Sequence, residues 1–492
     1  MKRLLVLALL GVLAGPALAS KEQLVVDLVN EPATLDPHRQ WNPDSYYVYR
    51  NIFDNLLTRD DAGAIQGEIA VSWKYLSDSE VEFSLREDVH YHDGSTLTAD
   101  DVAFSIQRIL DPAFASPQRG QFDKIASTHV VDPKTLRIRT DGPYPGLLAQ
   151  LVKLSVVPRQ TVQKMGDQAF NAAPVGSGPY RFSRWQRGVG VALERNPDYW
   201  GKPGAFERVN FRAVPDAATR LADLQSGTAD LAVSLDSDQA DQLANSPRAR
   251  LLSAATERVA FLRLNPSKPP FDNLQVRRAA ALAIDRDAIN QALLGGRERP
   301  LNQMLTPSHI GWSDELPPSV YDPDQARALL AAAGPGTELE LSTTPVFDQR
   351  VIQALQQMLE EVGFKVRISM ADMATFLQRS QGDPKQDGNL GFGRWSCACQ
   401  DADGVLYPLL YSQSNSSNYQ DAESDRLLLE ARSTLDEPRR AALYRQVNQR
   451  INDQVPMIPL FQSVALYGAS KSLQWQPTAN ESLFINRMAW SQ

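Results

Sequence analysis

This chain has little cysteine and histidine, and it lacks several patterns that would identify an enzyme. Its 492 residues include two cysteines and five histidines. The Gly-x-Ser-x-Gly elbow of serine hydrolases is absent, the histidines have no recognisable partner residues, and no thioredoxin-like Cys-x-x-Cys occurs. These absences disfavour hydrolytic and redox catalysis. We therefore expect no enzymatic activity, no cofactor and no metal site.

Long apolar runs without charge are also scarce. The run from Leu4 to Leu13 follows Lys2 and Arg3. It is shorter than the ~20 residues of a membrane span, and no later run is comparable. The small residues at 17–19 complete the pattern of a signal peptide, residues 1–19, cleaved after about Ala19. We expect an exported, soluble periplasmic protein without a lipid anchor, because no cysteine lies near the cleavage site.

Further absences bear on domains and partners. No tract of five like charges, no Gly/Ser linker and no repeat of fixed period occurs, so domain boundaries must be argued from the pattern of helices and strands. The length predicts two or three domains. The formal net charge of −8 becomes −10 once Lys2 and Arg3 are removed, which argues against nucleic acid as a partner. We expect a monomer.

The segment 176–201 is the most informative part of the sequence. Gly176 and Gly178 predict backbone angles closed to other residues, and Pro179 fixes φ. An apolar alternation begins at Tyr180 and predicts a strand, and the segment ends in an aromatic corner, Tyr199-Trp200. The pattern indicates that these residues have a structural role and not a catalytic one.

Other landmarks follow the same order along the chain. We predict strands at 24–28, 81–85, 231–235, 365–368 and 390–392. Thr98 and Asp101 form a capping box for a helix. Further helices are expected from 220 to a stop at Gly227, over 276–286, from an Asp322 cap to Gly334, and over 351–362.

Together these landmarks resemble the extracellular solute-binding proteins, family 5, which feed peptides and similar solutes to ABC importers. The resemblance covers about residues 24–461. It includes Glu31-Pro32, Leu35-Asp36-Pro37, Tyr91-His92-Asp93-Gly94 and the segment 176–201. It implies an α/β, two-lobed periplasmic-binding-protein fold of the large peptide-binding type, with an extra α+β domain and a hinge of two crossing segments.

The resemblance also implies the ranges of three domains. Lobe I comprises residues 20–46, 172–262 and 464–492, domain II residues 47–171, and domain III residues 263–463. The hinge crossings are expected near 263–265 and 460–462. The implied function is capture of a solute between two lobes and its delivery to a membrane permease.

The segment 394–404, Arg-Trp-Ser-Cys-Ala-Cys-Gln-Asp-Ala-Asp-Gly, resembles the ligand-facing loop of the family. Peptide-binding relatives carry an aspartate three places after the tryptophan, where it holds the peptide ammonium. Here that place is Ala398, and the carboxylates follow at Asp401 and Asp403. Two alternatives follow: Asp401 serves as the anchor, or the ligand has no free ammonium, as in opine-like, blocked or sugar-containing solutes.

The relatives that bind dipeptides also use an arginine for the peptide carboxylate. The corresponding loop here, 343–348, has no cation before Arg350, which makes a strict dipeptide ligand less favoured. We expect a peptide or peptide-like ligand. Its predicted contacts are the side chains Arg394, Trp395, Asp401, Asp403, Tyr46 and Tyr407, with Trp41, Tyr47 and Tyr411 as further aromatic candidates.

Both cysteines, Cys397 and Cys399, lie in the same loop. An exported chain meets an oxidising compartment, so a disulfide between them is plausible, with one residue in the ring. A structural clasp or two buried thiols is the favoured interpretation, ahead of redox catalysis and metal binding.

Overall fold

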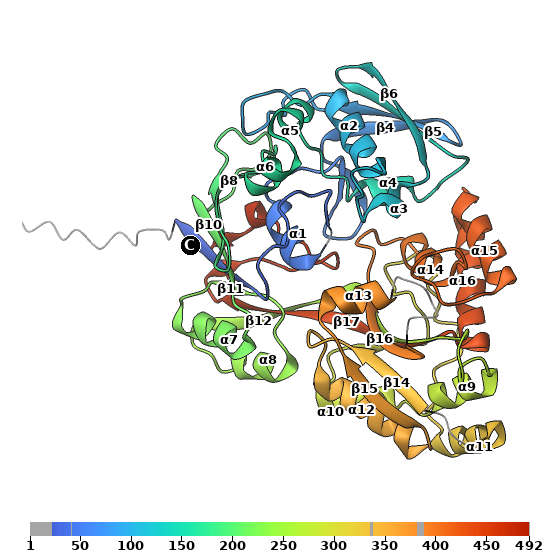
Figure 1. Cartoon of the computed structure of the whole chain (residues 1–492). Coiled ribbons are helices and arrows are strands. Elements are labelled where there is room, and N and C mark those ends of the chain that lie inside the picture. Colours follow the sequence, from blue (N-terminus) through green and yellow to red (C-terminus); the bar gives the residue numbers. More distant parts are fainter. Residues whose placement is uncertain (1–21, 41, 335–337, 381–387, 492) are drawn as a thin grey trace, which may run out of the picture.

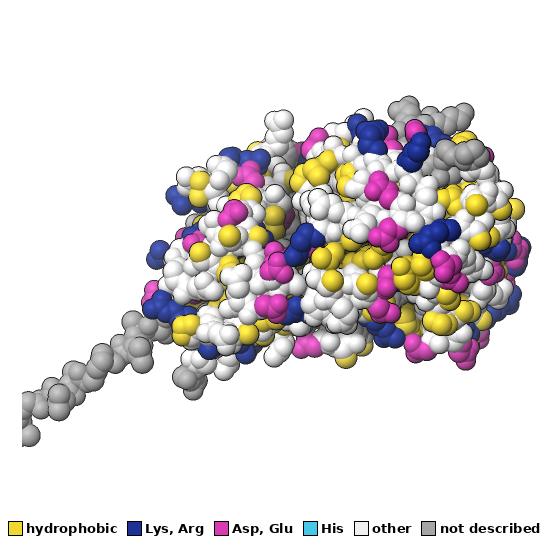
Figure 2. Space-filling view, turned by 90° about the horizontal axis from the view of Figure 1, so that it is seen from below, with side chains coloured by type: hydrophobic (Ala, Val, Ile, Leu, Met, Phe, Trp, Pro, Cys, Tyr) yellow, Lys and Arg dark blue, Asp and Glu magenta, His cyan; other side chains and the backbone are white. Residues whose placement is uncertain are grey.

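The computed structural model describes residues 22–40, 42–334, 338–380 and 388–491. The predicted signal peptide, residues 1–19, and Trp41 lie outside the described residues. None of the described helices is both long and apolar enough to cross a membrane. On the face shown in Figure 2, acidic and basic side chains are interspersed with hydrophobic ones.

One mixed sheet of eleven strands runs through the chain, in the order β15-β14-β16-β12-β17-β11-β1-β10-β9-β8, with β13 beside β17 (Figure 1). Its strands are β1 Gln23–Leu28, β8 Tyr180–Gln186, β9 Gly190–Arg195, β10 Arg208–Ala213, β11 Leu231–Ala232, β12 Ala249–Leu264, β13 Arg299–Pro300, β14 Glu338–Thr343, β15 Lys365–Met370, β16 Leu390–Trp395 and β17 Met457–Ser470. The sheet therefore contains strands from both lobe I and domain III.

The two longest strands, β12 and β17, connect these regions. They pair antiparallel from Ala249 and Ser470 at one end to Arg263 and Met457 at the other. Toward lobe I, β17 also pairs with β11, whereas toward domain III β12 pairs with β16. Their register is interrupted between Ala255 and Val259. Figure 1 shows both strands running from the side of α7 and α8 toward β14, β15 and β16.

Domain II contains a separate sheet in the order β4-β5-β7-β6. Its own hydrophobic core, drawn from residues 56–156, includes the inward face of α2. The predicted capping box of α2 is present, with Thr98 as the N-cap and Asp101 reaching back to it. Helix α1, Pro43–Tyr49, precedes this sheet and packs in the core of lobe I. The elements that follow are β2 Leu57–Arg59, β3 Ile65–Gly67, β4 Ala70–Ser77, β5 Glu80–Leu85, α2 Ala99–Leu110, α3 Arg119–Phe122, β6 Ile125–Asp132, β7 Thr135–Thr140, α4 Leu147–Leu151, α5 Arg159–Met165 and α6 Asp167–Ala172.

The remaining helices surround the large sheet. They are α7 Ala217–Ser226, α8 Ser237–Leu243, α9 Leu274–Leu282, α10 Arg286–Leu293, α11 Pro323–Ala333, α12 Gln349–Glu361, α13 Met373–Ser380, α14 Asp403–Leu410, α15 Ala422–Ser433 and α16 Glu437–Gln454. A short 3₁₀ turn, Ile485–Arg487, and a two-stranded sheet of β18, Leu473–Gln474, and β19, Ala489–Trp490, complete the C-terminal part.

Two helix and strand predictions are wrong in detail. The helix expected over 276–286 is two helices, α9 and α10, because Asp285 accepts a hydrogen bond from the Ala288 amide and caps the second one. The strand expected over 231–235 is β11, which ends at Ala232, and Ser234 has a positive φ of 56°. The stop at Gly227 is confirmed, with φ 85°.

Segment 176–201 packs against the chain just after α1. Neither Gly176 nor Gly178 has a positive φ. Both are needed for space, because a Cβ at Gly176 would lie 2.0 Å from the Ile52 carbonyl oxygen and one at Gly178 would lie 2.7 Å from that of Asn51. The reason inferred from the sequence, an unusual backbone conformation, is therefore wrong at these two positions.

A buried carboxylate joins the other polar and aromatic residues of this segment into one structural unit. Asp54 accepts hydrogen bonds from the Ser177 hydroxyl at 2.9 Å, the Tyr199 hydroxyl at 3.0 Å and the Trp200 indole at 2.9 Å. Burial raises the pKa of Asp54, while these donors and Arg50 oppose the shift. The aromatic corner thus anchors lobe I to domain II.

Candidate functional site: a cavity between the lobes

A cavity of about 420 Å³ lies where lobe I faces domain III. From the lobe I side it is lined by Gln40, Asn42, Ser234, Arg258 and Glu481, with Pro43 and Tyr47 of α1 beside them. From domain III it is lined by residues of β14, β15, β16, α13 and the loop before α12. A solute held in this cavity would therefore contact both lobe I and domain III.

Aromatic side chains form much of the domain III wall. The ring centroids of Phe347 and Phe392 lie 5.0 Å apart, and Phe376 is 5.9 Å from Phe347, both pairs in edge-to-face geometry. Phe261 of β12 and Trp395 of β16 also line the cavity. Rings in this arrangement offer an apolar surface with a defined shape to a ligand.

Two of the predicted contacts, Arg394 and Trp395, line the cavity. They lie on β16 rather than in the loop, because this strand extends past the predicted 390–392 to Trp395. The Trp395 indole donates to the Gly404 carbonyl oxygen at 2.9 Å. This hydrogen bond joins the two ends of the segment 395–404.

Of the predicted tyrosines, Tyr47 is among the described residues that line the cavity, whereas Tyr46, Tyr407 and Tyr411 are not. Tyr46 is buried, and its hydroxyl is 3.0 Å from that of Ser482, whereas its neighbour Tyr47 lines the cavity. Tyr407 stacks on Tyr411 with centroids 4.6 Å apart, and the guanidinium carbon of Arg432 lies 3.7 Å from the centre of its ring.

The two predicted carboxylates are both buried and paired with arginines inside domain III. Asp401 accepts hydrogen bonds of 2.8 and 2.6 Å from Arg440 of α16. Burial alone would raise the pKa of Asp401, but the Arg440 guanidinium outweighs burial and holds the pKa below its usual value. A ligand ammonium would have to displace this guanidinium.

Asp403, at the start of α14, has the same kind of environment. It pairs with Arg432 of α15 at 3.0 Å and accepts a hydrogen bond from the Tyr144 hydroxyl of domain II at 3.1 Å. Burial raises its pKa, although Arg432 opposes the shift. Neither carboxylate is among the described residues that line the cavity. Sequence reasoning missed both arginines, because they come from helices 29 and 39 residues further along the chain.

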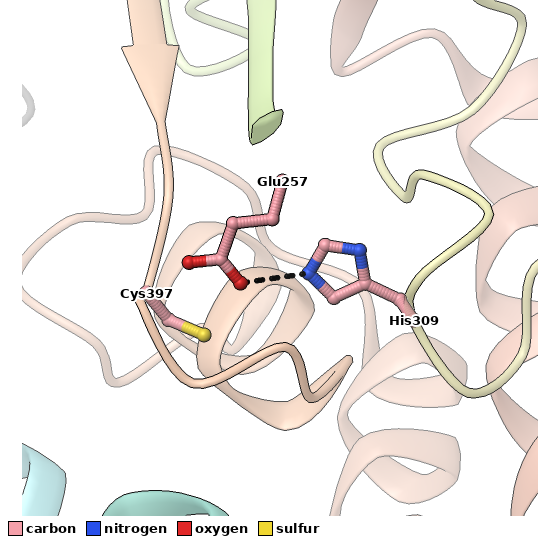
Figure 3. Close-up of side chains that lie close together, drawn as sticks. All are labelled: Glu257, His309 and Cys397. Carbon is pink, nitrogen blue, oxygen red and sulfur yellow. Dashed lines mark ion pairs between the residues drawn. The ribbon is translucent and has the colours of Figure 1, made fainter. Parts of the chain in front are cut away.

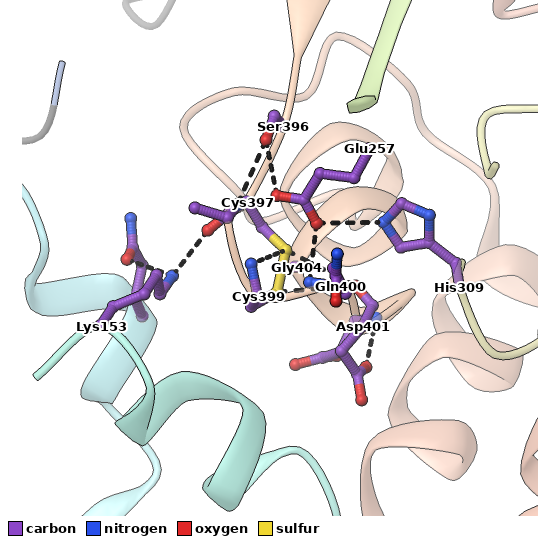
Figure 4. Close-up of a disulfide and its surroundings, with 12 residues drawn as sticks. Lys153, Glu257, His309, Ser396, Cys397, Cys399, Gln400, Asp401 and Gly404 are labelled. Atoms are coloured by element: carbon purple, nitrogen blue, oxygen red, sulfur yellow. Dashed lines mark hydrogen bonds and ion pairs between the residues drawn. A yellow bond between two sulfur atoms is a disulfide. The ribbon is translucent and has the colours of Figure 1, made fainter. Parts of the chain in front are cut away.

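Cys397 and Cys399 are joined by a disulfide, with Cα atoms 5.1 Å apart (Figure 4). The intervening Ala398 and the following Gln400 have positive φ angles of 54° and 52°, a conformation that costs a non-glycine residue of order 1 kcal/mol or more. The Glu257 carboxylate accepts from the Ser396 hydroxyl and the Gln400 amide, both at 2.7 Å. These bonds hold the loop in its tight turn.

The disulfide loop also receives two cations from domain II. The Lys153 ammonium donates to the Cys397 carbonyl oxygen at 3.0 Å (Figure 4). It also donates to the Gln121 side chain at 2.6 Å, and Arg59 donates to the Cys399 carbonyl oxygen. Burial lowers the pKa of Lys153 to about 7. No sequence pattern distinguishes Lys153 or Arg59 from surface cations, so both were missed.

Glu257, His309 and Cys397 lie close together beside this loop, with their potential ligand atoms within 4.8 Å of one another (Figure 3). They do not fit a metal ion in this state. The Cys397 sulfur is used in the disulfide, and His309 Nδ1 accepts from the Thr306 amide at 3.2 Å, which places the imidazole proton on Nε2. Nε2 then faces the Glu257 carboxylate at 3.7 Å.

The Asp401–Arg440 pair leads to a stability prediction. Asp401→Ala leaves the Arg440 charge buried without a partner, so we expect a loss of about 3–5 kcal/mol of unfolding free energy in urea titrations. The double variant Asp401→Leu/Arg440→Leu should lose less, since it removes both charges. Normal stability of Asp401→Ala together with a tenfold loss of ligand affinity would instead identify Asp401 as a ligand anchor.

Lys153 leads to a pH prediction. In the folded protein it loses its proton near pH 7, whereas in the unfolded chain it keeps it to about pH 10.4. The unfolded state binds more protons between these values, so this group makes stability rise with pH by up to about 1.4 kcal/mol per unit. Lys153→Met should lack that rise, and the exposed-site control Lys164→Met should keep it, in urea titrations at pH 7 and pH 9. Parallel profiles for wild type and Lys153→Met would contradict the prediction.

Comparisons with known proteins agree with this geometry. The sequence model of the family "Bacterial extracellular solute-binding proteins, family 5 Middle" matches residues 64–417 of this chain. The glutathione-binding protein GsiB of Salmonella typhi is 29% identical over 481 residues, which cover 94% of this chain and 93% of that protein. The solved structure of DppA from Helicobacter pylori in complex with peptide STSA has a TM-score of 0.87 and 24% identity, covering 96% of this chain and 99% of that one.

The structure of AgaA in complex with agropinic acid, from A. tumefacien, has a TM-score of 0.83 and 27% identity, again covering 96% of this chain and 99% of the other. These likenesses confirm the predicted fold class, the two-lobed α/β fold of the large periplasmic peptide-binding type. Because the family model spans most of its length, this chain belongs to the bacterial extracellular solute-binding proteins, family 5.

Proposed function

We propose that the cavity between lobe I and domain III is the ligand site of a periplasmic receptor that captures a solute and delivers it to an ABC permease. The observation that carries this proposal is the lining itself, since Arg258 and Glu481 face Phe347 and Arg394 across one space. A ligand that touches both sides favours the closed arrangement over an open one by its differential affinity.

Ion pairs between lobe I and domain III are compatible with a closing motion. Two acidic residues of α8, Asp238 and Asp241, form ion pairs with Arg350 and Arg297 of domain III. These pairs are partly exposed, so each contributes about 0–1 kcal/mol and can break on opening. The resemblance to the family put the hinge crossings near 263–265 and 460–462. We propose instead that the two sides rotate where the register of β12 and β17 is interrupted, between Ala255 and Val259.

The ligand class follows from the relatives as a proposal. Glutathione, a peptide and an opine are named in the descriptions of GsiB, DppA and AgaA respectively. We propose a peptide or peptide-like ligand, with an opine or a sugar-containing solute as the alternative. We further propose that residues 1–19 are removed, that the receptor is a monomer and that it binds its solute without chemical turnover.

A thermal-shift screen tests this function. A receptor at 100 times its Kd gains about 2.7 kcal/mol of stability, so a matching solute should raise the melting temperature by several degrees. The screen should contain di-, tri- and tetrapeptides, opines and sugar conjugates, and mass spectrometry should recover each stabilising solute intact. Recovery of a hydrolysed product would indicate an enzyme instead. No shift with any member at millimolar concentration would contradict the receptor function.

A further inference from the structure

Two arginines facing the cavity have no acceptor within the described part of the chain. Arg394 of β16 and Arg379 of α13 both line the cavity, and neither makes a hydrogen bond or an ion pair with a described residue. Arg394 lies over the Phe347 ring, with its guanidinium carbon 5.8 Å from the centroid. Both residues are exposed. A planar guanidinium in this position is suited to bidentate pairing with a carboxylate.

The other cavity arginines are already paired, which makes Arg379 and Arg394 distinct. Arg258 donates to both oxygens of Glu481, each at 3.1 Å. Arg263 donates to the Ser380 carbonyl oxygen at 2.6 Å. The described lining therefore contains four arginines and one carboxylate, although the whole chain has a net charge of −8. The cavity is a basic region in an acidic protein, which favours an anionic solute.

The same described lining offers no free carboxylate to a ligand ammonium. Glu481 is held by Arg258, and Asp401 and Asp403 are buried against Arg440 and Arg432. Arg394 acts electrostatically on two nearby carboxylates, Asp348 and Glu298, and neither of them is among the described residues that line the cavity. Asp348 is bound by Arg350 through hydrogen bonds of 3.2 and 2.8 Å. An ammonium buried here would lose its hydration without gaining an ion pair among the described residues.

The remaining lining is mostly apolar. Besides the aromatic wall of Phe261, Phe347, Phe376, Phe392 and Trp395, it includes Val346, Met373 and Leu409. A cavity of about 420 Å³ is in the lower part of the range that encloses small ligands, roughly 300–1,000 Å³. Its size and lining suit a compact ligand with an apolar body.

We infer that the ligand is a small amphiphilic anion without a free ammonium, bound with its carboxylate at Arg394 and Arg379 and its apolar body against the phenylalanine wall. N-acylated amino acids and N-acylated dipeptides have this chemistry. The inference rests on the proposed receptor function, and it selects the alternative in which no amine anchor is needed at Ala398. It makes Arg394 and Arg379 specificity-determining residues.

A matched pair of probes tests the charge requirement by isothermal titration calorimetry. N-acetyl-phenylalanyl-leucine has the apolar side chains and a carboxylate, whereas phenylalanyl-leucine amide has the same side chains and an ammonium. We expect the acetylated acid to bind at least tenfold more tightly than the amide. Equal or tighter binding of the amide, or no binding of the acid at millimolar concentration, would overturn the inference.

Variants test which residues bind the carboxylate of the ligand. Arg394→Gln should weaken binding of the acetylated acid at least tenfold, and Arg379→Gln/Arg394→Gln should weaken it further, whereas binding of the amide should not weaken. Arg327→Gln, an exposed arginine of α11 paired with Asp324, is the matched control and should leave the affinity unchanged. Melting temperatures establish that each variant is folded. Undiminished affinity in the folded double variant would exclude the two arginines as anchors.

The outcomes separate this inference from the receptor function. If a neutral or cationic solute from the thermal-shift screen stabilises the protein and the acetylated acid does not bind, the receptor function stands and the anionic class is wrong. If no solute of any class binds, the receptor function itself fails. Binding of the acetylated acid that depends on Arg394 supports both.

Discussion

The antiparallel pairing of β12 with β17 is the constraint on which the rest of the structure depends. Within the single large sheet, these two strands link the strands of lobe I to those of domain III, and residues of β12 line the cavity. The register of the two strands is interrupted between Ala255 and Val259, and the residues in this interval have different partners. Glu257 receives hydrogen bonds from the disulfide loop, while Arg258 pairs with Glu481 in the cavity. The proposed hinge is thus in contact with both the disulfide loop and the cavity.

Three acidic residues lie near the disulfide loop, and their partners explain why they do not offset the basic lining of the cavity. Asp401, Asp403 and Glu257 all lie near this loop, and each is satisfied by groups outside the cavity: arginines of α15 and α16, or the loop itself. The loop carbonyls in turn accept from cations of domain II. The loop carbonyls and Asp403 join domain II to domain III. Arg394, at the end of β16, remains available to a solute.

The sequence predicted helix starts and stops well where they depend on interactions between residues close together in the chain. The Thr98 capping box, the stop at Gly227 and the Asp322 cap depend on neighbours within a few residues, and all are found. The glycines at 176 and 178 were recognised as important for the wrong reason, because their contact is with a distant backbone segment. Within the site, Trp395 and Arg394 could be located from the family pattern. The partners of Asp401 and Asp403 could not, since pairing with Arg440 and Arg432 depends on how α15 and α16 pack against α14.

The proposed capture of a solute in this cavity involves closure of lobe I on domain III by rotation about the β12–β17 pair. Small-angle X-ray scattering of the mature chain, with and without a saturating solute whose binding has been established by calorimetry, measures this most directly. We expect a smaller radius of gyration and a narrower pair-distance distribution in the bound state. Identical scattering curves for the free and the saturated protein would contradict closure between the lobes as the means of capture.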